Sequence, residues 1–348
     1  MCIIHLVSSR GGPERWNPRR RPERQPTGHI FVPGIAATKA LSEASFPRRP
    51  GVGLRSLLSV LTTHIRHFHN QKDKEDIMNA HLMIIDPQND FMDTANAALP
   101  VPGAIEDMRR VAALIDRVGR RLTDIHVTLD SHRVIDVAHP GMWMDAAGNS
   151  PAEYTVITAA DIEKGIWTPR APSLRKRMLA YARQLLGGNK YALMIWPEHC
   201  VIGTAGHNVQ GDLMEALKRW ERREFANVDY VVKGTNPYTE HYGALMAEVP
   251  DADDPATGLN TKFLEMLAEA DVVAVAGEAL SHCVRSTVDQ IVENIGESHL
   301  GKFVILTDCS SPVPQVGNGP DFPALTAAWL GDMRSRGVHL MKADKFLA

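Results

Sequence analysis

One cysteine stands where α/β proteins commonly present a nucleophile. The apolar, β-branched segment Val272–Gly277 predicts a strand, a short turn follows, and Cys283 lies where the sequence becomes compatible with a helix. The N–H groups and positive dipole end of a helix N-terminus lower the pKa of a thiol, so we expect a reactive thiolate here. The alternative is a buried cysteine that acts as a small apolar side chain, the class to which we assign Cys200 and Cys309.

A carboxylate and a lysine follow two other apolar segments. Asp86 ends residues 81–86, and Lys233 ends residues 228–233. A carboxylate beside a thiol in a partly dry pocket can take the thiol proton and return it to a leaving amine. A lysine there would hold that carboxylate in place and favour the thiolate. Taken alone, Asp86 also fits a turn residue, and Lys233 fits a strand-end side chain that reaches water. We expect Asp90 to brace its loop by hydrogen bonds.

Three further side chains predict a metal site. Asp130 and His132 form an Asp-x-His pair after another apolar segment, and His199 lies in a loop flanked by proline and glycine. One carboxylate and two imidazoles with open positions for water suit Zn²⁺ best, and also Mn²⁺ or Fe²⁺. The pair alone is a weak signal, because the chain has 15 histidines. We predict Asp130, His132 and His199 as ligands of one divalent ion, with His139 as a fourth ligand or an outer partner.

Backbone and aromatic groups complete the expected site. The N–H groups of Ala279 and Cys283 are suited to form an oxyanion hole for a tetrahedral intermediate. Phe91, Trp143 and Trp196 are candidate pocket walls, because a flat aromatic substrate stacks on such rings. Each of the three aromatic residues could equally belong to the core.

The elements that would position these residues alternate between strands and helices from residue 81 onward. Strands are expected over 81–86, 124–130, 228–233, 272–277, 303–308 and 338–342, and helices over 103–122, 173–186, 209–225, 261–270, 283–295 and 321–336. Apolar strands separated by helices indicate a mostly parallel sheet with helices on both faces, a three-layer α/β sandwich. Because ligands bind at the carboxyl ends of such strands, the candidate residues should gather at one edge.

The N-terminal segment differs in composition from the rest of the chain. Residues 1–77 are rich in arginine and proline, and residues 1–72 carry 12 of the 38 Lys and Arg but 3 of the 41 Asp and Glu. The remaining residues hold 26 basic against 38 acidic side chains. Three interpretations of the segment stay open: an extension without regular structure, an organelle transit peptide, or a basic interaction arm.

Cysteine usage and hydropathy limit the cellular compartment and the partners that we expect for the protein. Four cysteines without a CxxC pair argue for a reducing compartment. We expect a cytoplasmic protein, or a mitochondrial or other organellar one if the N-terminal segment is a transit peptide. No apolar run reaches the length of a membrane span, and the acidic body offers no basic face for nucleic acid. The expected partner is a small-molecule substrate, and a homo-oligomer is left open.

Together these segments resemble the isochorismatase-like cysteine hydrolases, and within them the nicotinamidases (pyrazinamidases). The matching pieces follow the family's order over residues 81–345: 86–91 (DPQNDF), 130–132 (DSH), 196–206 (WPEHCVIGTAG), 232–234 (VKG) and 281–284 (SHCV). The resemblance implies an isochorismatase-like hydrolase domain over residues 78–348 with a six-stranded parallel sheet. It also implies an Asp86–Lys233–Cys283 triad, the metal ligands named above, and a cis peptide bond between Glu278 and Ala279. Isochorismatases and carbamoyl-sarcosine-type amidases of this fold generally lack the metal motif.

The activity that the resemblance implies is hydrolysis of nicotinamide to nicotinate and ammonia, a step of NAD salvage. Cys283 would form a thioester, and water activated by the metal would cleave it. The nearest alternative is a related metal-bearing cysteine amidohydrolase with a different carboxamide substrate. The long stretch between His139 and Trp196, and the departures at Glu278 and Leu280, motivate that alternative. A non-catalytic binding protein of the same fold and a nucleic-acid adaptor that uses the basic arm are further alternatives.

Overall fold

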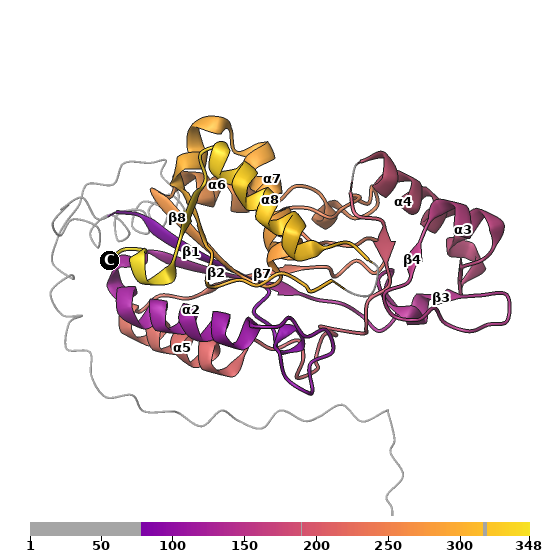
Figure 1. Cartoon of the computed structure of the whole chain (residues 1–348), viewed down its shortest axis with the longest axis horizontal. Coiled ribbons are helices and arrows are strands. Elements are labelled where there is room, and N and C mark those ends of the chain that lie inside the picture. The colour runs from indigo at the N-terminus through magenta and orange to yellow at the C-terminus, as the bar shows by residue number, and fades with distance from the viewer. Residues whose placement is uncertain (1–77, 189, 316–318) are drawn as a thin grey trace, which may run out of the picture. The chain divides into compact units, whose positions relative to one another are not determined.

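The computed structural model describes residues 78–188, 190–315 and 319–348, and these form regular strands and helices (Figure 1). The predictions for residues 1–77 lie outside the described residues. The main strands are β1 (Ala80–Ile85), β2 (Asp124–Asp130), β7 (Asp229–Lys233), β8 (Val272–Gly277), β9 (Phe303–Leu306) and β10 (His339–Met341). The helices that accompany them are α2 (Ala104–Val118), α5 (Gly211–Glu224), α6 (Thr261–Glu269), α7 (Arg285–Asn294) and α8 (Phe322–Ser335).

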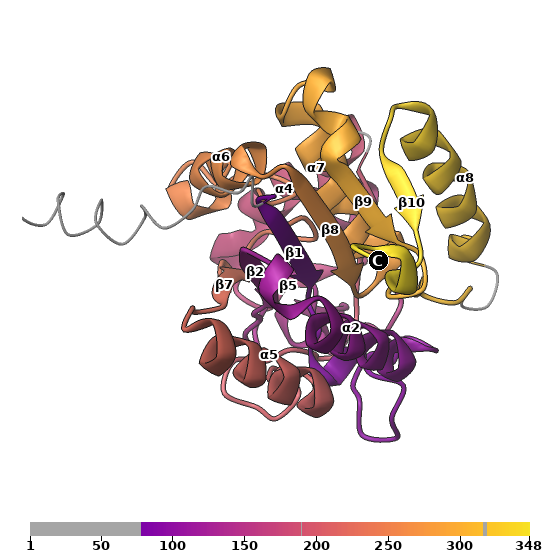
Figure 2. The same ribbon diagram turned by 90° about the vertical axis from the view of Figure 1, so that its left-hand side faces the viewer.

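The six main strands form one parallel sheet in the order β10-β9-β8-β1-β2-β7. Helices α2 and α5 cover one face of this sheet, and α6, α7 and α8 cover the other (Figure 2). The expected α/β sandwich with a six-stranded parallel sheet is therefore confirmed. Among the described residues, no helix combines the length and apolar character that crossing a membrane requires.

Strand β1 shows why the sheet needs a layer on each side. All six of its residues are buried. Leu82 and Ile84 pack in the apolar cluster that includes α2 and α5, whereas Met83 and Ile85 pack in the cluster that includes α6, α7 and α8. Successive residues of a strand point to opposite faces, so an apolar strand buries both sets only between two layers.

The helices differ from their expected bounds by one to four residues at an end, and two of the differences have a clear local cause. The helix expected over 103–122 ends as α2 at Val118, where Gly119 has a φ of 39° that favours glycine, and a short 3-10 turn follows. The helix expected over 283–295 begins only at Arg285, because Leu280–Val284 forms a wider, π-type turn. Cys283 thus lies in a turn of its own in front of α7.

The stretch between His139 and Trp196 builds a separate small layer beyond one end of the sheet (Figure 1). It contains α3 (Ala159–Lys164) and α4 (Arg175–Gly187), with β3 (Trp143–Met144) paired to β5 (Thr168–Pro169) and β4 (Val156–Ile157) paired to β6 (Leu193–Met194). These elements enclose a third apolar cluster. The sequence analysis predicted only the second helix, and it missed the capping box of Thr158 and Asp161 that starts α3.

Candidate active site

Four neighbouring strands end at the same edge of the sheet and carry the candidate catalytic residues. Asp86 follows β1, Asp130 ends β2, Lys233 ends β7, and Cys283 follows β8. These strands are adjacent in the order β8-β1-β2-β7. Because parallel strands point their carboxyl ends the same way, residues almost 200 positions apart in sequence meet here, as ligand sites of such sheets require.

The ammonium group of Lys233 contacts the other two residues of the predicted triad and also Asp130. Its Nζ lies 2.8 Å from Asp86 Oδ2, 3.0 Å from Asp130 Oδ1 and 3.7 Å from Cys283 Sγ. It also donates to the carbonyl oxygen of His241 at 2.8 Å. Burial lowers the pKa of Lys233, but the carboxylates of Asp130 and Asp86 outweigh it and hold that pKa well above its usual value. The lysine is therefore a fixed positive charge that contacts both the acid and the sulfur.

Asp86 has the surroundings of an acid–base group. Its side chain is fully buried, and its Oδ1 accepts a hydrogen bond from Thr128 of β2. Burial raises the pKa of Asp86, and the opposing charge of Lys233 only partly offsets that rise. A carboxylate with a raised pKa takes up a proton more readily than an ordinary aspartate, which suits it to deprotonate a neighbouring thiol.

The thiol of Cys283 differs from expectation in its pKa. We predicted that a helix N-terminus would lower this pKa, and that prediction is wrong. Burial raises the pKa of Cys283 well above its usual value, Lys233 opposes the rise, and the negative charges of Asp86 and Asp130 add to it. The resting side chain is a neutral thiol, so reaction requires a base that removes the proton as the sulfur attacks.

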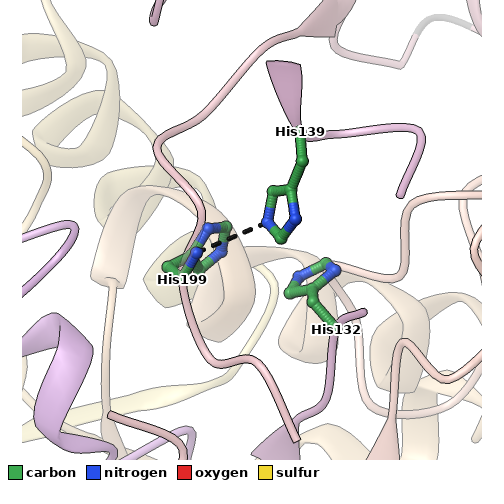
Figure 3. A group of neighbouring side chains, drawn as sticks. All are labelled: His132, His139 and His199. Atoms are coloured by element: carbon green, nitrogen blue, oxygen red, sulfur yellow. Dashed lines mark hydrogen bonds between the residues drawn. The ribbon is translucent and has the colours of Figure 1, made fainter. Parts of the chain in front are cut away.

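Three buried imidazoles converge beside this cluster (Figure 3). One ring nitrogen from each of His132, His139 and His199 lies within 4.8 Å of those from the other two. Asp130 adds a carboxylate oxygen, because its Oδ2 lies 2.9 Å from His132 Nε2 and 3.6 Å from His199 Nε2. The structure thus brings the three predicted ligands together, and it places His139 with them.

The outer nitrogen of each ring faces an acceptor of the protein. The Nδ1 atoms of the three histidines lie against Asp136 Oδ2 at 3.2 Å (His132), the Arg133 carbonyl at 2.9 Å (His139) and the Pro197 carbonyl at 2.8 Å (His199). The carbonyl acceptors hold the ring protons of His139 and His199 on Nδ1, which leaves the lone pair of Nε2 directed inward. Burial lowers the pKa of His132, but the carboxylates of Asp130 and Asp136 outweigh it and hold that pKa well above its usual value, so His132 gives up a proton when it binds a cation. Burial, with the neighbouring His199 and His132, lowers the pKa of His139 to about 3, so this ring is neutral. Three inward nitrogens and one carboxylate oxygen are a donor set that fits a divalent metal ion.

Two residues of the DPQNDF segment support this donor set. The side-chain amide of Gln88 pairs with the backbone of Asp130, accepting its N–H and donating to its carbonyl, both at 2.7 Å. Asp90 Oδ2 accepts the N–H of Cys200 at 2.7 Å and so holds the loop that carries His199. The bracing role predicted for Asp90 is confirmed by this bond.

Gly234 allows the lysine strand to approach Asp130. Its φ is 78°, a value that favours glycine, and a Cβ atom there would lie 2.9 Å from Asp130 Oδ1. The same oxygen contacts Lys233 Nζ. A side chain at position 234 would therefore disturb the contact between the lysine and the carboxylate.

A small pocket opens onto Cys283 of the triad and onto Asp130 and His199 of the metal-binding group. It has an empty volume of about 390 Å³, which includes space open to solvent, and is lined by Phe91, Leu99, Val101, Asp130, Trp196, His199, Glu240, Tyr242, Ala279, His282, Cys283 and Val313. Of the predicted aromatic walls, Phe91 and Trp196 lie here. Trp143 does not: it is fully buried in the third apolar cluster, where its indole N–H donates to the Val137 carbonyl at 2.8 Å.

The turn that carries the nucleophile also meets the pocket. The peptide bond between Glu278 and Ala279 is cis, as the resemblance implied. Ala279 and Cys283 both line the pocket, so the two residues predicted to form an oxyanion hole belong to the same wall. Their role as donors remains a prediction.

Two buried acids of the site, Glu240 and Asp136, were not predicted from the sequence. Glu240 is buried in the pocket wall, with Oε1 4.0 Å from His132 Nε2. Burial raises the pKa of Glu240 to about 7, with His132 opposing that rise. Asp136 Oδ2 lies 3.2 Å from the outer nitrogen of His132. Both lie in loops where an acidic residue has no pattern of its own, and only the neighbouring Lys233 and His132 motifs could have directed attention to them.

Comparison with known proteins identifies the fold. No protein-family model and no curated protein sequence matches this chain. A nicotinamidase/pyrazinamidase of Acinetobacter baumanii matches with a TM-score of 0.50 at 20% sequence identity, over 77% of this chain and 98% of that one. The yeast nicotinamidase matches with a TM-score of 0.50 at 19% identity, over 75% of this chain and 99% of that one. The chain therefore has the fold of the nicotinamidase structures, and the fold that the motifs implied is confirmed.

Proposed function

We propose that this protein is a cysteine amidohydrolase that cleaves nicotinamide to nicotinate and ammonia through a thioester on Cys283. The contacts of Lys233 are the observation that carries the proposal. One buried ammonium reaches the Asp86 carboxylate at 2.8 Å and the Cys283 sulfur at 3.7 Å, beside a pocket that can take a ligand. A structural ion pair does not require a thiol at the mouth of a pocket, whereas nucleophilic catalysis does.

Proton transfer is assigned to Asp86 and Cys283. Asp86 takes the thiol proton while the sulfur attacks the carboxamide carbon, and the raised pKa of Asp86 favours that transfer. Lys233 keeps the carboxylate in place and stabilises the forming thiolate. When the tetrahedral intermediate collapses, protonated Asp86 returns its proton to the departing ammonia.

The pocket walls bind and orient the substrate. In this mechanism the N–H groups of Ala279 and Cys283 donate to the oxyanion, and a flat ring stacks on Phe91 and Trp196. All four residues line the pocket. A divalent ion held by Asp130, His132 and His199, with His139 in reach, would supply a Lewis acid that activates water and anchors the substrate. The nicotinamidases that share this fold support nicotinamide as the substrate.

Ammonia release from nicotinamide by the full chain, with and without a chelator, tests this function. Replacement Cys283→Ala should lower turnover below detection and leave the circular dichroism spectrum unchanged. The matched control is Cys309→Ala, which removes another buried thiol that does not line the pocket. Undiminished turnover by Cys283→Ala would refute the proposal.

A carboxamide panel decides between nicotinamide and the alternative substrate. If nicotinamide is the substrate, its kcat/KM should exceed that of aliphatic and of larger aromatic carboxamides. A larger carboxamide with the higher kcat/KM, still dependent on Cys283, would replace nicotinamide in the proposal and retain the amidohydrolase chemistry.

A further inference from the structure

Glu278 is a buried acid that the proposed chemistry does not use. It precedes the cis peptide bond on the nucleophile turn, is 0% exposed, and does not line the pocket. Its side chain is directed instead toward Ser311, which follows β9, and toward Asp107 of α2. A fully buried carboxyl group needs a partner for each oxygen, because an unpaired charge in the interior is strongly unfavourable.

The hydrogen bonds around Glu278 account for only one of its two oxygens. Oε2 accepts the N–H of Ser311 at 3.2 Å, whereas Oε1 has no donor among the described residues. An oxygen in this position is satisfied when it carries a proton and donates it. The neighbouring acceptor is the buried carboxyl group of Asp107, whose Oδ2 accepts from the hydroxyl of the same Ser311 that donates its N–H to Glu278 Oε2.

Asp107 is the acceptor of this pair, because both of its oxygens already accept hydrogen bonds from other groups. Its Oδ1 accepts from the Arg110 guanidinium at 2.7 Å, and its Oδ2 accepts from the Ser311 hydroxyl. Burial, together with the charge of Asp107 and the hydrogen bond to it, raises the pKa of Glu278 well above its usual value. The other charged or titratable groups around the two carboxyls are Asp93, Arg110, Asp308 and Cys309.

The segment that contacts Glu278 also holds the rest of the nucleophile turn. Gly277 N–H donates to the Cys309 carbonyl at 2.9 Å, Leu280 N–H donates to the Ser311 carbonyl at 2.9 Å, and Val313 N–H donates to Ser281 Oγ at 3.0 Å. Ser311 therefore contacts the turn through Leu280 and Glu278, and contacts α2 through Asp107. A displacement of Glu278 would be transmitted to Ala279 and to the turn that carries Cys283.

We propose that Glu278 is a positioning residue whose carboxyl group keeps its proton, donates it to the Asp107 carboxylate, and so ties the nucleophile turn to α2 without adding a negative charge next to the proposed oxyanion hole. The effect on turnover depends on the proposed amidase function. The protonation of Glu278 does not depend on it, and the experiments keep the two apart.

Infrared difference spectroscopy of the full chain tests protonation directly. Wild type at neutral pH should show the carbonyl stretch of a protonated carboxyl group, and Glu278→Gln should lack that band. The control Glu106→Gln changes the exposed acid that precedes Asp107 on α2 and should retain the band. A wild-type spectrum without a band that Glu278→Gln removes would overturn the proposal, whatever the activity of the protein.

The pH dependence of unfolding supplies a second test without substrate. The folded pKa of Glu278 lies above the unfolded value of about 4.3, so the folded state keeps a proton that the unfolded chain releases. The stabilisation is complete below that unfolded pKa and is lost as pH rises toward the folded one. Glu278→Gln should lack this loss and become more stable relative to wild type as pH rises. Equal slopes for the two proteins, or a Glu278→Gln chain that does not fold, would contradict the proposal.

The turnover of two variants then tests whether Glu278 positions the turn that carries Cys283. Gln at position 278 can still donate to Asp107 and accept from Ser311, so Glu278→Gln should keep kcat within about 3-fold of wild type. Leu cannot do either, and Glu278→Leu should lower kcat roughly 10- to 100-fold with little change in KM, as a displaced catalytic group does. Equal kcat for the Gln and Leu variants would refute positioning. If no variant turns over nicotinamide while the infrared band behaves as expected, the substrate assignment fails and the protonated pair stands.

Discussion

Two groups of buried histidines lie at opposite ends of the same sheet, and only one group is arranged to bind a ligand. At the amino ends of the strands, His81 of β1 and His126 of β2 face each other, with His126 Nε2 3.1 Å from His81 Nδ1. His81 Nε2 lies 3.1 Å from Asn79 Oδ1, and His126 Nδ1 lies 3.0 Å from Asp229 Oδ2. Every ring nitrogen of this pair has a partner within the protein.

At the carboxyl ends, carbonyl or carboxylate acceptors face the outer nitrogens, and the inner nitrogens lie around one shared centre. His132 Nε2 lies 2.9 Å from Asp130 Oδ2, and His139 Nε2 accepts the His199 N–H at 3.5 Å. The Nε2 atoms of His132, His139 and His199 converge on one another and on Asp130. The comparison shows that burial and proximity of histidines do not identify a metal site. The distinguishing feature is that one ring nitrogen from each of three histidines lies within 4.8 Å of the others, next to the Asp130 carboxylate.

The largest expected difference between the two ends is in metal content and activity. His132→Ala removes a central ligand and should leave the purified protein without stoichiometric metal by mass spectrometry, with ammonia release below detection. His126→Ala, at the other end of the sheet, should retain the metal of wild type. Equal metal content in the two variants would show that the two ends of the sheet do not differ in metal binding.

A smaller effect, on metal affinity, is expected when Asp136, the acceptor beside His132 Nδ1, is changed. Asp136→Asn weakens the hold on Nδ1, and loss of such an outer partner typically lowers metal affinity 10- to 100-fold. Asp124→Asn is the matched control, because Asp124 Oδ2 lies 3.3 Å from His81 Nε2 at the opposite end. Competition with a chromogenic chelator measures both affinities, and an unchanged affinity in Asp136→Asn would show that Asp136 does not orient the ligand.

A substitution at Gly234, which lies against Asp130, should lower kcat by a smaller factor. Gly234→Ala places a Cβ close to Asp130 Oδ1 at a φ of 78°, which is unfavourable for alanine. We expect kcat to fall roughly 10-fold, because the lysine and the carboxylate move apart. Gly301→Ala, where a Cβ meets no atom within 4 Å, is the control. Steady-state kinetics that do not distinguish the two variants would contradict this expectation.

The smallest effect concerns acid stability at the amino ends of the strands. The hydrogen bond from His126 lowers the pKa of Asp229, with burial opposing it, so this carboxylate stabilises the fold above its unfolded pKa of about 3.9. That contribution is lost as pH falls through the lower, folded pKa. Asp229 is almost half exposed, so we expect less than about 1 kcal/mol. Urea titrations between neutral and acidic pH should show less acid destabilisation in Asp229→Asn than in wild type; equal destabilisation would exclude the contribution.

Much of the fold could be predicted from the sequence, because each strand is a continuous apolar segment with a helix-compatible segment after it. The same pattern predicted that Asp86, Lys233 and Cys283 meet, since the ends of parallel strands share an edge. The layer between His139 and Trp196 was mostly missed. Its strands are two residues long, which is too short for any periodicity to register.

The site was harder to predict where its properties depend on three-dimensional surroundings. Trp143 looked like a pocket wall, yet its depth in the third apolar cluster follows from packing that no local pattern reveals. The pKa of Cys283 was predicted in the wrong direction, because a local argument includes the helix end and omits burial. No sequence pattern pointed to Glu240, because only the three-dimensional path of its loop brings it into the pocket wall.

The single carboxylate of Asp130 has a consequence for anyone who would engineer this protein. One oxygen serves the ammonium of Lys233, and the other serves the imidazoles, so the electron density that a bound cation draws from one side is no longer available to the other. If the proposed metal site and nucleophile are correct, metal occupancy and the reactivity of Cys283 are expected to be linked through this one side chain. Exchanging the metal would then also change the reactivity of the thiol.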